Sequence, residues 1–323
     1  MTGAHGGSVI APRPLPVSGL VLSPLGLGTA ALGDRSDDDA ADNAAKTIDL
    51  ALASGISYVD TAPHYGIGAA ERRAGAALGA HPRDRFTLST KVGRIIDEDA
   101  RTETFDFSPP AVRSSLESSL LRLGLARVDI AYVHDPDHAE DAARRDAFPA
   151  LRDLRAEGTI RAIGAGMNQA AMLERFVTDP ALGVDLVLLA GRYTLLDQSG
   201  LRLLDLCGER GVGVVLGGVF NSGILADPRP GASYDYRAAP GELVERARRL
   251  ARVCERHGVA LTAVALQFGW GHPAVVSVLN GAGSPDEMVA NLGHAETVIP
   301  AACWEDFRSN GLVPPGVPVP GEL

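Results

Sequence analysis

Four side chains that can move a proton follow strand-like segments of this sequence. Asp60 and Tyr65 lie in the heptapeptide Asp-Thr-Ala-Pro-His-Tyr-Gly (60–66), which comes directly after an apolar run. Lys91 and His134 each end a later apolar run. A phenol beside an ammonium, a carboxylate and an imidazole is suited to transferring a proton to or from an oxygen. We therefore expect these four residues to form a proton-transfer site.

The charge of Lys91 is central to this expectation. The sequence contains only two lysines, and Lys91 is the one that closes an apolar strand. A buried ammonium is costly unless it is paired, so we expect Asp60 to be its partner. Lys91 would then favour the phenolate of Tyr65, because a nearby positive charge lowers the pKa of a phenol. Moving that pKa from its ordinary value of about 10 to ~7 requires about 4 kcal/mol. His134 would orient the reacting oxygen.

Short β-rich runs alternate with helical patterns along the chain, which is typical of βα units. We predict strands near Leu25–Gly28, Tyr58–Asp60, Thr87–Lys91, Asp129–His134, Ile160–Gly164, Leu186–Ala190, Gly213–Gly217 and Val275–Leu279. Helical patterns fall between them, for example at Ala44–Ala53, Pro109–Leu123, Phe148–Ala156, Ala170–Val177 and Leu201–Glu209. Eight such units predict an α/β fold, a single (β/α)8 TIM barrel, in which the carboxyl ends of the strands form the active-site face.

The segments outside this alternation are expected to play separate roles. Residues 1–14 are rich in Gly, Pro and small polar types and are predicted to be a flexible tail before a barrel of residues 15–323. The long segment Asp227–Pro240 is predicted to be a loop that overhangs the strand ends. The proline-rich segment Gly311–Leu323 cannot form a regular helix. We expect it to lie across the barrel as a lid or a plug.

Composition excludes several classes of function. The 323 residues carry a formal net charge of −10, which argues against a nucleic-acid or anionic-membrane surface. No apolar run approaches a membrane span and no signal pattern opens the chain, so we expect a cytoplasmic protein. The three cysteines are widely spaced and odd in number, as expected of small buried residues in a reducing compartment. Neither they nor the scattered histidines have metal-ligand spacing, and we predict no metal site.

The heptapeptide, Lys91 and His134 together resemble the catalytic tetrad of the aldo-keto reductases. The segment 23–30 is similar to that family's first-strand signature, and Gly-Ala-Gly-Met-Asn (164–168) lies where the family has a Gly-Val-Ser-Asn segment. Further segments resemble a branch that includes L-fucose, D-threo-aldose and galactose dehydrogenases, with pyridoxal 4-dehydrogenase as a relative. The resemblance implies that Asp60, Tyr65, Lys91 and His134 are catalytic. It also implies that hydride moves to or from a nicotinamide cofactor.

The same resemblance implies a set of cofactor contacts. Gly28 and Thr29 match the segment under the nicotinamide ribose, and Asn168 matches the residue that holds the carboxamide. The pyrophosphate would lie on the turn from Gly218 to Gly223 and the adenosine end near the last strand, so the implied contacts also include Gly218, Phe220, Asn221, Ser222, Gly223, Gly281 and Asn291.

Three departures from the family pattern bear on the cofactor. Members that prefer NADP carry a Lys and an Arg where this chain has Gly281 and Glu287. A 2′-phosphate needs cations, so we predict a preference for NAD over NADP. Gly217 stands where many relatives stack a Tyr on the nicotinamide.

The substrate is expected to be a small molecule, a sugar or another carbonyl compound. Asp135 could accept hydrogen bonds from sugar hydroxyls, although it could equally be a turn residue before a proline, and His64 could reach the same pocket. The leading hypothesis is oxidation at C1 of a cyclic aldose to a lactone. One alternative is an aldehyde or ketone reductase of the same family, in secondary metabolism for example. Another is a cofactor-binding regulatory subunit with little turnover.

Overall fold

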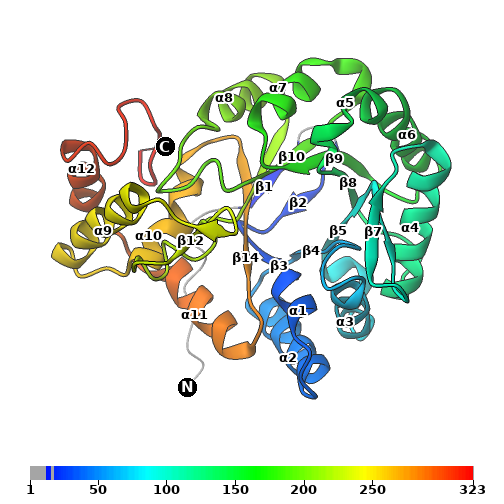
Figure 1. Cartoon of the computed structure of the whole chain (residues 1–323), viewed down its shortest axis with the longest axis horizontal. Coiled ribbons are helices and arrows are strands. Elements are labelled where there is room, and N and C mark those ends of the chain that lie inside the picture. The colour runs from blue at the N-terminus through cyan, green and yellow to red at the C-terminus, as the bar shows by residue number, and fades with distance from the viewer. Residues whose placement is uncertain (1–11, 16–17, 323) are drawn as a thin grey trace.

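Eight parallel strands close into a barrel that the helices surround (Figure 1). The computed structural model describes residues 12–15 and 18–322. The barrel strands, in the order in which they pair around the ring, are β10 (Leu186–Ala190), β11 (Gly213–Gly217), β14 (Val275–Gly281), β3 (Leu25–Gly28), β4 (Tyr58–Asp60), β5 (Thr87–Val92), β8 (Ile130–His134) and β9 (Ala162–Met167). The predicted fold is therefore confirmed. The predicted strand 160–164 was placed too early, because β9 begins at Ala162 and ends at Met167.

The helices follow the strands as the sequence pattern predicts. They are α1 (Ala30–Asp34), α2 (Ala40–Ala53), α3 (Ala69–Leu78), α4 (Pro109–Leu123), α5 (Glu140–Ala142), α6 (Phe148–Ala156), α7 (Ala170–Thr178), α8 (Leu201–Arg210), α9 (Gly241–Arg256), α10 (Leu261–Phe268), α11 (Pro285–Glu296) and α12 (Ala301–Ser309). The long helices pack their apolar sides against the outer surface of the barrel. One continuous hydrophobic cluster fills the space between these helices and the strands. No helix in the described ranges combines the length and the apolar character that crossing a membrane would require.

The inside of the barrel is filled by side chains, and two tyrosines are the largest of them. Tyr58 of β4 and Tyr132 of β8 are fully buried, and their hydroxyls lie 3.0 Å apart. Gly26 and Gly164 make room for the two rings. A Cβ atom on Gly164 would lie 2.5 Å from the Tyr132 ring and 2.6 Å from the carbonyl oxygen of Leu186. Glycine at this position is therefore a packing requirement of the barrel interior.

A short hairpin closes the amino-terminal end of the barrel. It consists of β1 (Arg13–Pro14) and β2 (Val21–Leu22), and it inserts Leu15 and Leu20 into the interior cluster. Arg13 donates hydrogen bonds to the carbonyl oxygens of His272 and Val275 at 2.8 and 2.9 Å, which ties the hairpin to the last βα unit. Of the predicted tail 1–14, residues 1–11 lie outside the described residues, whereas Arg13 and Pro14 form a strand.

Two further hairpins stand beyond the carboxyl ends of the strands. One, β6 (Arg94–Asp97) with β7 (Thr102–Phe105), follows β5 and was not predicted. The other, β12 (Ser233–Tyr234) with β13 (Arg237–Ala238), lies inside the segment 227–240 that we predicted to be a loop. Its turn residues Asp235 and Tyr236 both have positive φ, of 50° and 60°. Both connections therefore contain regular structure that the sequence pattern did not predict.

The carboxyl-terminal segment does not cross the barrel, contrary to our expectation. It packs beside α9, α10 and α12 at the edge of the molecule (Figure 1). Arg246 of α9 donates to the carbonyl oxygen of Leu312, and Arg308 of α12 donates to that of Val317. Leu312, Val313, Val317 and Val319 are buried there. Prolines exclude a helix but leave an extended chain free to bury alternating apolar side chains, and this segment does so on the outer helices.

The glycine requirement inside the barrel can be tested by stability. Replacing Gly164 by Ala forces a methyl group against a tyrosine ring and a backbone carbonyl, so we expect Gly164→Ala to lower the free energy of unfolding by about 1–3 kcal/mol in urea titrations. Gly208→Ala is the matched control, because a Cβ atom there lies 3.8 Å from its nearest neighbour, in ordinary contact. In helix α8 that change should stabilise by roughly 0.5–1 kcal/mol. Equal stabilities of the two variants would contradict the packing argument.

Candidate active site

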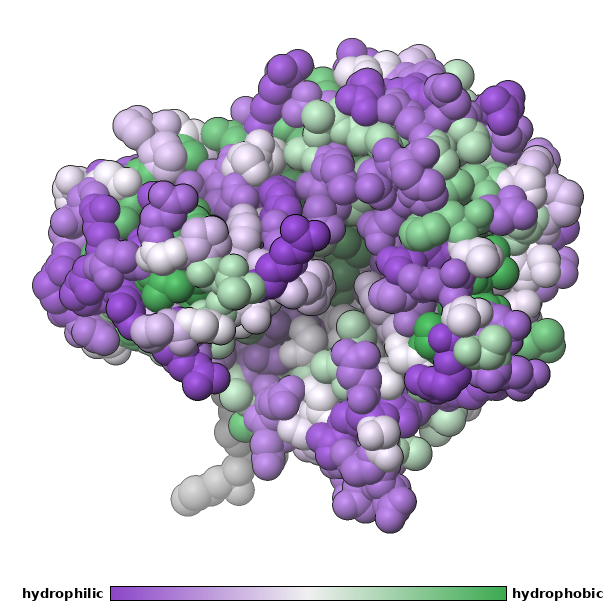
Figure 2. Space-filling view, in the orientation of Figure 1, coloured by the Kyte–Doolittle hydropathy of each residue, from purple (hydrophilic) through white to green (hydrophobic). Residues whose placement is uncertain are grey.

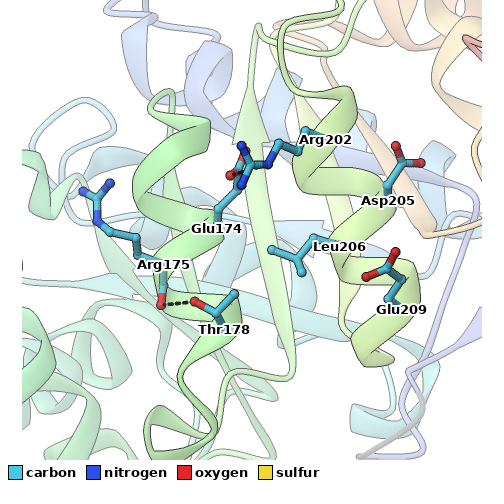
Figure 3. Close-up of a pocket in the computed structure, with 7 residues that line it drawn as sticks. All are labelled: Glu174, Arg175, Thr178, Arg202, Asp205, Leu206 and Glu209. Atoms are coloured by element: carbon cyan, nitrogen blue, oxygen red, sulfur yellow. Dashed lines mark hydrogen bonds and ion pairs between the residues drawn. The ribbon is translucent and has the colours of Figure 1, made fainter.

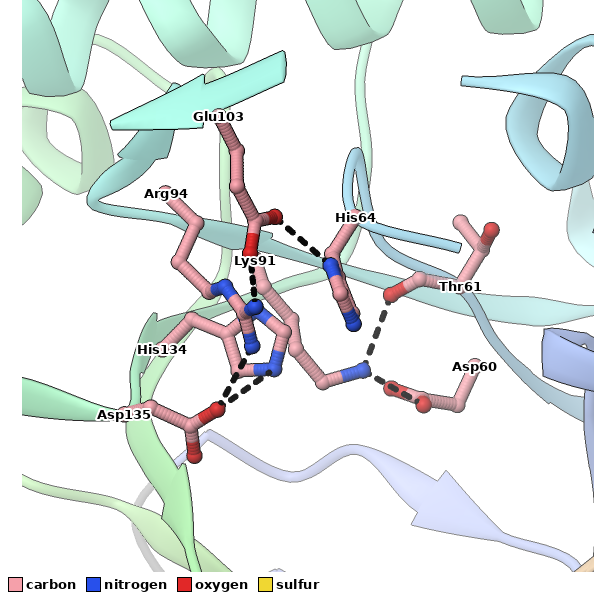
Figure 4. Close-up of polar contacts among 8 residues, drawn as sticks. All are labelled: Asp60, Thr61, His64, Lys91, Arg94, Glu103, His134 and Asp135. Atoms are coloured by element: carbon pink, nitrogen blue, oxygen red, sulfur yellow. Dashed lines mark hydrogen bonds and ion pairs between the residues drawn. The ribbon is translucent and has the colours of Figure 1, made fainter. Parts of the chain in front are cut away.

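The barrel brings Asp60, Tyr65, Lys91 and His134 together at the carboxyl ends of β4, β5 and β8. The Lys91 Nζ donates hydrogen bonds to Asp60 Oδ2 at 2.7 Å and to the carbonyl oxygen of Thr61 at 3.0 Å (Figure 4). The same nitrogen lies 4.6 Å from the centre of the Tyr65 ring. The rings of Tyr65 and His134 are 6.3 Å apart and nearly perpendicular. The expectation that these four residues meet is therefore correct.

A close backbone contact places Tyr65. Gly66 has φ of 62°, and a Cβ atom on it would lie 2.3 Å from the carbonyl oxygen of Gly33 in α1. The loop after β4 can therefore press directly against α1 only because both positions are glycine. The Tyr65 carbonyl oxygen accepts from the amide of Ala70, at the start of α3. Tyr65 is thus held between two helices rather than on a free loop.

The ion pair between Lys91 and Asp60 is deeply buried, with side-chain exposures of 2% and 3%. Both oxygens of Asp60 are engaged, because Ser89 donates to Oδ1 at 2.6 Å and Lys91 donates to Oδ2. Burial by itself would lower the pKa of Lys91, but Asp60 and Tyr65 outweigh it and the pKa is raised. Lys91 is therefore a permanent ammonium beside the phenol.

The effect of this ammonium on Tyr65 differs from our expectation. Burial raises the pKa of Tyr65, and the opposing effect of Lys91 does not cancel it. The net shift is upward from the ordinary value of a phenol, and not toward neutrality. The expectation that Lys91 would lower the pKa of Tyr65 below that of an ordinary phenol is therefore wrong. In this state the phenol is a proton donor, and it becomes a base only when further positive charge or high pH favours the phenolate.

His134 is a neutral imidazole. Burial lowers its pKa well below the usual value, and the positive charges of Lys91 and Arg94 lower it further. Its Nε2 lies 3.6 Å from Asp135 Oδ2, and its buried Nδ1 has no hydrogen-bond partner among the described residues. A neutral ring can accept or donate one hydrogen bond to a reacting oxygen, which suits it to orienting a substrate.

A row of buried hydroxyls lies beneath the ion pair, and our sequence reasoning missed it. The Tyr58 hydroxyl lies 3.0 Å from both the Tyr132 hydroxyl and the Ser89 Oγ, and Ser89 in turn donates to Asp60. We call Asp60, Tyr65, Lys91 and His134 the proton-transfer group. Tyr58, Ser89 and Tyr132 lie two residues before Asp60, Lys91 and His134, respectively. Because side chains two apart in a strand share a face, this spacing is a signal that could have found them.

A polar wall stands beside Tyr65 and His134; we use this name for His64, Arg94, Glu103 and Asp135. Figure 4 shows the four side chains converging from three separate loops. We predicted His64 and Asp135 as substrate contacts, but missed Arg94 and Glu103, which lie on the unpredicted β6–β7 hairpin. Residues 94–97 and 102–105 do not alternate between polar and apolar types, so periodicity could not have found this hairpin.

The residues implied for the nicotinamide end lie at the barrel mouth. Gly28 ends β3, and Thr29 is fully buried with its Oγ1 lacking a hydrogen-bond partner among the described residues. Asn168 follows β9 and donates through Nδ2 to the carbonyl oxygen of Ala190 at 2.8 Å. Within the described residues, its side-chain amide oxygen accepts no hydrogen bond. A free amide oxygen and an unpaired hydroxyl fit a polar ligand such as a carboxamide and ribose.

The turn from Gly218 to Gly223 has the backbone of an anion-binding loop. Gly218, Asn221, Ser222 and Gly223 all have positive φ, and Ser222 and Gly223 are exposed. The Asn221 side chain is buried and occupied, because it accepts from Thr194 and donates to the carbonyl oxygen of Gly191. Phe220 packs against the hydrophobic core. Asn221 and Phe220 therefore shape the turn. The Gly223 amide already donates to the carbonyl oxygen of Phe220 and the Ser222 Oγ accepts from the amide of Tyr236, so the hydroxyl hydrogen of Ser222 is what the turn can donate to an anion.

The residues implied for the adenosine end form the start of α11. Asn291 is buried and donates to the carbonyl oxygen of Gly281 at 3.0 Å. The Ser284 hydroxyl accepts from the amide of Glu287, while a Glu287 oxygen accepts from the amide of Gly283 at 2.7 Å. This differs from a capping box only in that the carboxylate accepts from the residue before the N-cap. It places a carboxylate at the helix end where a phosphate would otherwise bind.

The mouth of the barrel is a hollow with a partly hydrophobic floor and a hydrophilic rim (Figure 2). A separate pocket of about 400 Å³ lies outside the barrel between α7 and α8 (Figure 3). Its lining residues are Glu174, Arg175, Thr178, Arg202, Asp205, Leu206 and Glu209. None of them belongs to the proton-transfer group, so the chemistry is assigned to the mouth.

The buried ion pair can be tested by a double-mutant cycle. Asp60→Asn leaves a buried ammonium without a counter-charge, so we expect it to lower the free energy of unfolding by about 3–5 kcal/mol in urea titrations. Lys91→Met should be similar, and the double variant should cost less than the sum because no charge remains. Asp42→Asn removes the exposed partner of Lys46 and should have no measurable effect. Additive single effects would contradict a direct pair.

The comparisons with known proteins agree with this geometry. Residues 24–310 match the aldo/keto reductase family. The chain is 39% identical to D-threo-aldose 1-dehydrogenase of Pseudomonas sp, covering 92% of this chain and 96% of that one. It is 38% identical to pyridoxal 4-dehydrogenase of Microbacterium luteolum, covering 93% and 97%. The solved structure of aldo-keto reductase AKR11C1 from Bacillus halodurans (holo form) is 27% identical, covers 95% of this chain and 97% of that chain, and has a TM-score of 0.77. The chain belongs to the aldo/keto reductase family, and it is an oxidoreductase.

Proposed function

We propose that this enzyme oxidises the C1 hydroxyl of a cyclic aldose to a lactone with a nicotinamide cofactor. The observation that carries the proposal is the meeting of the Tyr65 phenol, the Lys91–Asp60 pair and neutral His134 beside a polar wall. The likeness to an aldose 1-dehydrogenase over nearly the whole chain supports the substrate class. The bound nicotinamide would accept the hydride from C1, and the hydroxyl proton would leave at the same time.

The protein's own groups would handle the proton and the orientation. The substrate hydroxyl would lie between Tyr65 and His134, and Tyr65 Oη would receive its proton. Lys91 would stabilise the phenolate, while Asp60 would hold Lys91 charged and in place. For this step Tyr65 must first be a phenolate, which its raised pKa makes rare at neutral pH, and after each turnover it must lose the accepted proton to solvent to become a base again.

A second candidate reaction is supported by the raised pKa of Tyr65. A phenol that keeps its proton at neutral pH is a good general acid. The same site would then reduce an aldehyde or ketone, with Tyr65 giving its proton to the carbonyl oxygen as hydride arrives at carbon. The two candidates differ in which substrate and which redox form of the cofactor the enzyme accepts.

We propose that the cofactor is NAD rather than NADP. Glu287 places its carboxylate at the start of α11, where it already occupies the amide of Gly283. A 2′-phosphate at this end of the site would meet a negative charge and lose that donor. Gly281, at the end of β14, offers no cation in compensation.

The thiols support a reducing compartment such as the cytoplasm. All three cysteines are buried and free. Burial raises the pKa of the Cys207 thiol to about 12, so it stays protonated and unreactive. Thiols persist in this form where glutathione and thioredoxin keep them reduced.

The dehydrogenase proposal predicts turnover of an aldose that depends on Tyr65. With NAD and a panel of fucose, galactose and arabinose, we expect formation of NADH on at least one sugar. Tyr65→Phe should lower kcat/KM at least 100-fold, because general base catalysis contributes about 10²–10⁴. Since the pKa of Tyr65 lies above that of an ordinary phenol, wild-type kcat/KM should rise about tenfold per pH unit from neutral to alkaline pH.

The control is Tyr236→Phe, which removes the same hydroxyl from a residue that is 93% exposed at the tip of the β12–β13 hairpin. It should retain both the rate and the pH dependence. If no sugar reacts while carbonyl compounds are reduced with NADH, the second candidate is correct. A pH profile that survives in Tyr65→Phe would remove Tyr65 from the reaction.

The cofactor proposal predicts that Glu287→Gln weakens the discrimination against NADP. Removing one charge close to the 2′ position is worth about 1 kcal/mol, so the ratio of Kd values for NADPH and NADH should fall about fivefold in fluorescence titrations. Glutamine can still accept from Gly283, so the cap survives. Glu296→Gln, at the other end of α11, is the control. A wild-type enzyme that binds NADPH more tightly than NADH would refute the proposal.

A further inference from the structure

One guanidinium joins the polar wall into a single unit. Arg94 Nη1 donates to Asp135 Oδ2 at 2.9 Å, and Nη2 donates to Glu103 Oε1. The other oxygen of Glu103 is 2.7 Å from His64 Nδ1. The Arg94 side chain is only 14% exposed, whereas those of Glu103 and Asp135 are 26% and 29% exposed, so these contacts are partly shielded from water. Three loops, after β4, β5 and β8, are thereby connected beside the reacting groups.

The polar wall is within reach of any substrate at the proton-transfer group. The His64 ring lies 6.0 Å from that of His134 and 6.1 Å from that of Tyr65. Asp135 follows His134 directly and contacts its Nε2 at 3.6 Å. A molecule with one oxygen between Tyr65 and His134 would extend its neighbouring substituents onto these side chains.

Asp135 is held in an unfavourable backbone conformation to face this site. Its φ of 45° and ψ of 55° are left-handed, which a residue with a side chain adopts at a cost. Arg94 holds one carboxylate oxygen, and no hydrogen bond within 12–15 and 18–322 reaches the other, Oδ1, which points away from Arg94 in Figure 4. That oxygen is free to accept a hydrogen bond from a ligand hydroxyl.

The charges of the polar wall do not balance. Arg94 contributes one positive charge, while Glu103 and Asp135 contribute two negative charges. These three side chains therefore have a net charge of −1. Carboxylates accept hydrogen bonds from hydroxyl groups, but they repel a second anion where water is partly excluded.

We propose that Arg94 and Glu103 are specificity-determining residues that act with Asp135 to select uncharged, polyhydroxylated substrates and to reject anionic ones such as uronates. Arg94 positions the Asp135 carboxylate toward the substrate, and Glu103 adds the charge that makes the wall negative. The part of this inference that concerns sugars rests on the proposed dehydrogenase function. The part that concerns rejection of anionic substrates does not, because it applies to any substrate bound at the polar wall.

The test compares a neutral substrate with its acidic counterpart. Wild-type enzyme should have a ratio of kcat/KM for galactose over galacturonate of at least 100. Glu103→Gln removes one negative charge and should lower that ratio about tenfold, mainly by lowering the KM for galacturonate. Asp135→Asn should lower the ratio as much and should also raise the KM for galactose. Arg94→Gln should raise the KM for both substrates at least tenfold, with kcat for galactose within threefold of wild type.

Glu98→Gln is the matched control. Glu98 lies in the connection between β6 and β7 and pairs with Arg72 and Arg122, away from the polar wall. It changes the net charge of the protein as Glu103→Gln does, and it should leave the ratio unchanged. Thermal melting of every variant, including Glu103→Gln, which removes a charged partner of the largely buried Arg94, separates a loss of discrimination from a loss of fold.

A second substrate pair separates this inference from the proposed function. If no aldose reacts, the same variants are assayed for reduction of 4-nitrobenzaldehyde and 4-carboxybenzaldehyde with NADH. A tenfold fall of the neutral-to-acidic ratio in Glu103→Gln would then support the charge rule while the dehydrogenase proposal fails. An unchanged ratio in Glu103→Gln and Asp135→Asn, with either pair, would overturn the inference. No turnover of any of these four compounds, and none of fucose or arabinose, would overturn both.

Discussion

The active-site face depends on one buried charge. Lys91 and Asp60 lie almost entirely out of water, where each ion loses several kcal/mol of hydration. The structure offsets that loss by satisfying both oxygens of Asp60 and two donors of Lys91. The parallel pairing of β4 with β5 sets Asp60 opposite Ser89, two residues before Lys91, and so brings the two charges together. The Lys91–Asp60 ion pair, the pairing of β4 with β5 and the position of the Tyr65 phenol therefore depend on one another.

The interior of the barrel supports this pair from below. Tyr58, Tyr132 and Ser89 form a hydrogen-bonded row that ends at Asp60, and each donor and acceptor in it is protected from solvent. Gly26 of β3, which pairs with β4, and Gly164 of β9, which pairs with β8, leave the space that the tyrosine rings fill. A polar network inside a core is stabilising only when its members are satisfied, and then it also specifies geometry. The rigidity of the strand ends comes from this layer.

The residues proposed for proton transfer and those proposed for substrate recognition lie on different parts of the fold. Asp60, Lys91 and His134 lie on strands, with their positions set by the ladder of the barrel. The polar wall comes from three loops, and a single arginine makes them one surface. Loops can change between relatives while the strand ends stay in place.

Hydrophobic periodicity and polar residues at strand ends are local properties of a sequence. The βα alternation, the eight strands and the places of Asp60, Tyr65, Lys91 and His134 near the strand ends could therefore be predicted. Prediction from the sequence failed where contacts are non-local. The β6–β7 hairpin, the inward-facing Tyr58 and Tyr132, and the course of the carboxyl-terminal segment depend on neighbours far along the chain. The pKa of Tyr65 was mispredicted for the same reason, since the balance between burial and the charge of Lys91 exists only in the folded barrel. Residue types and spacing identify which groups can react, and tertiary packing decides the protonation state in which they meet a substrate.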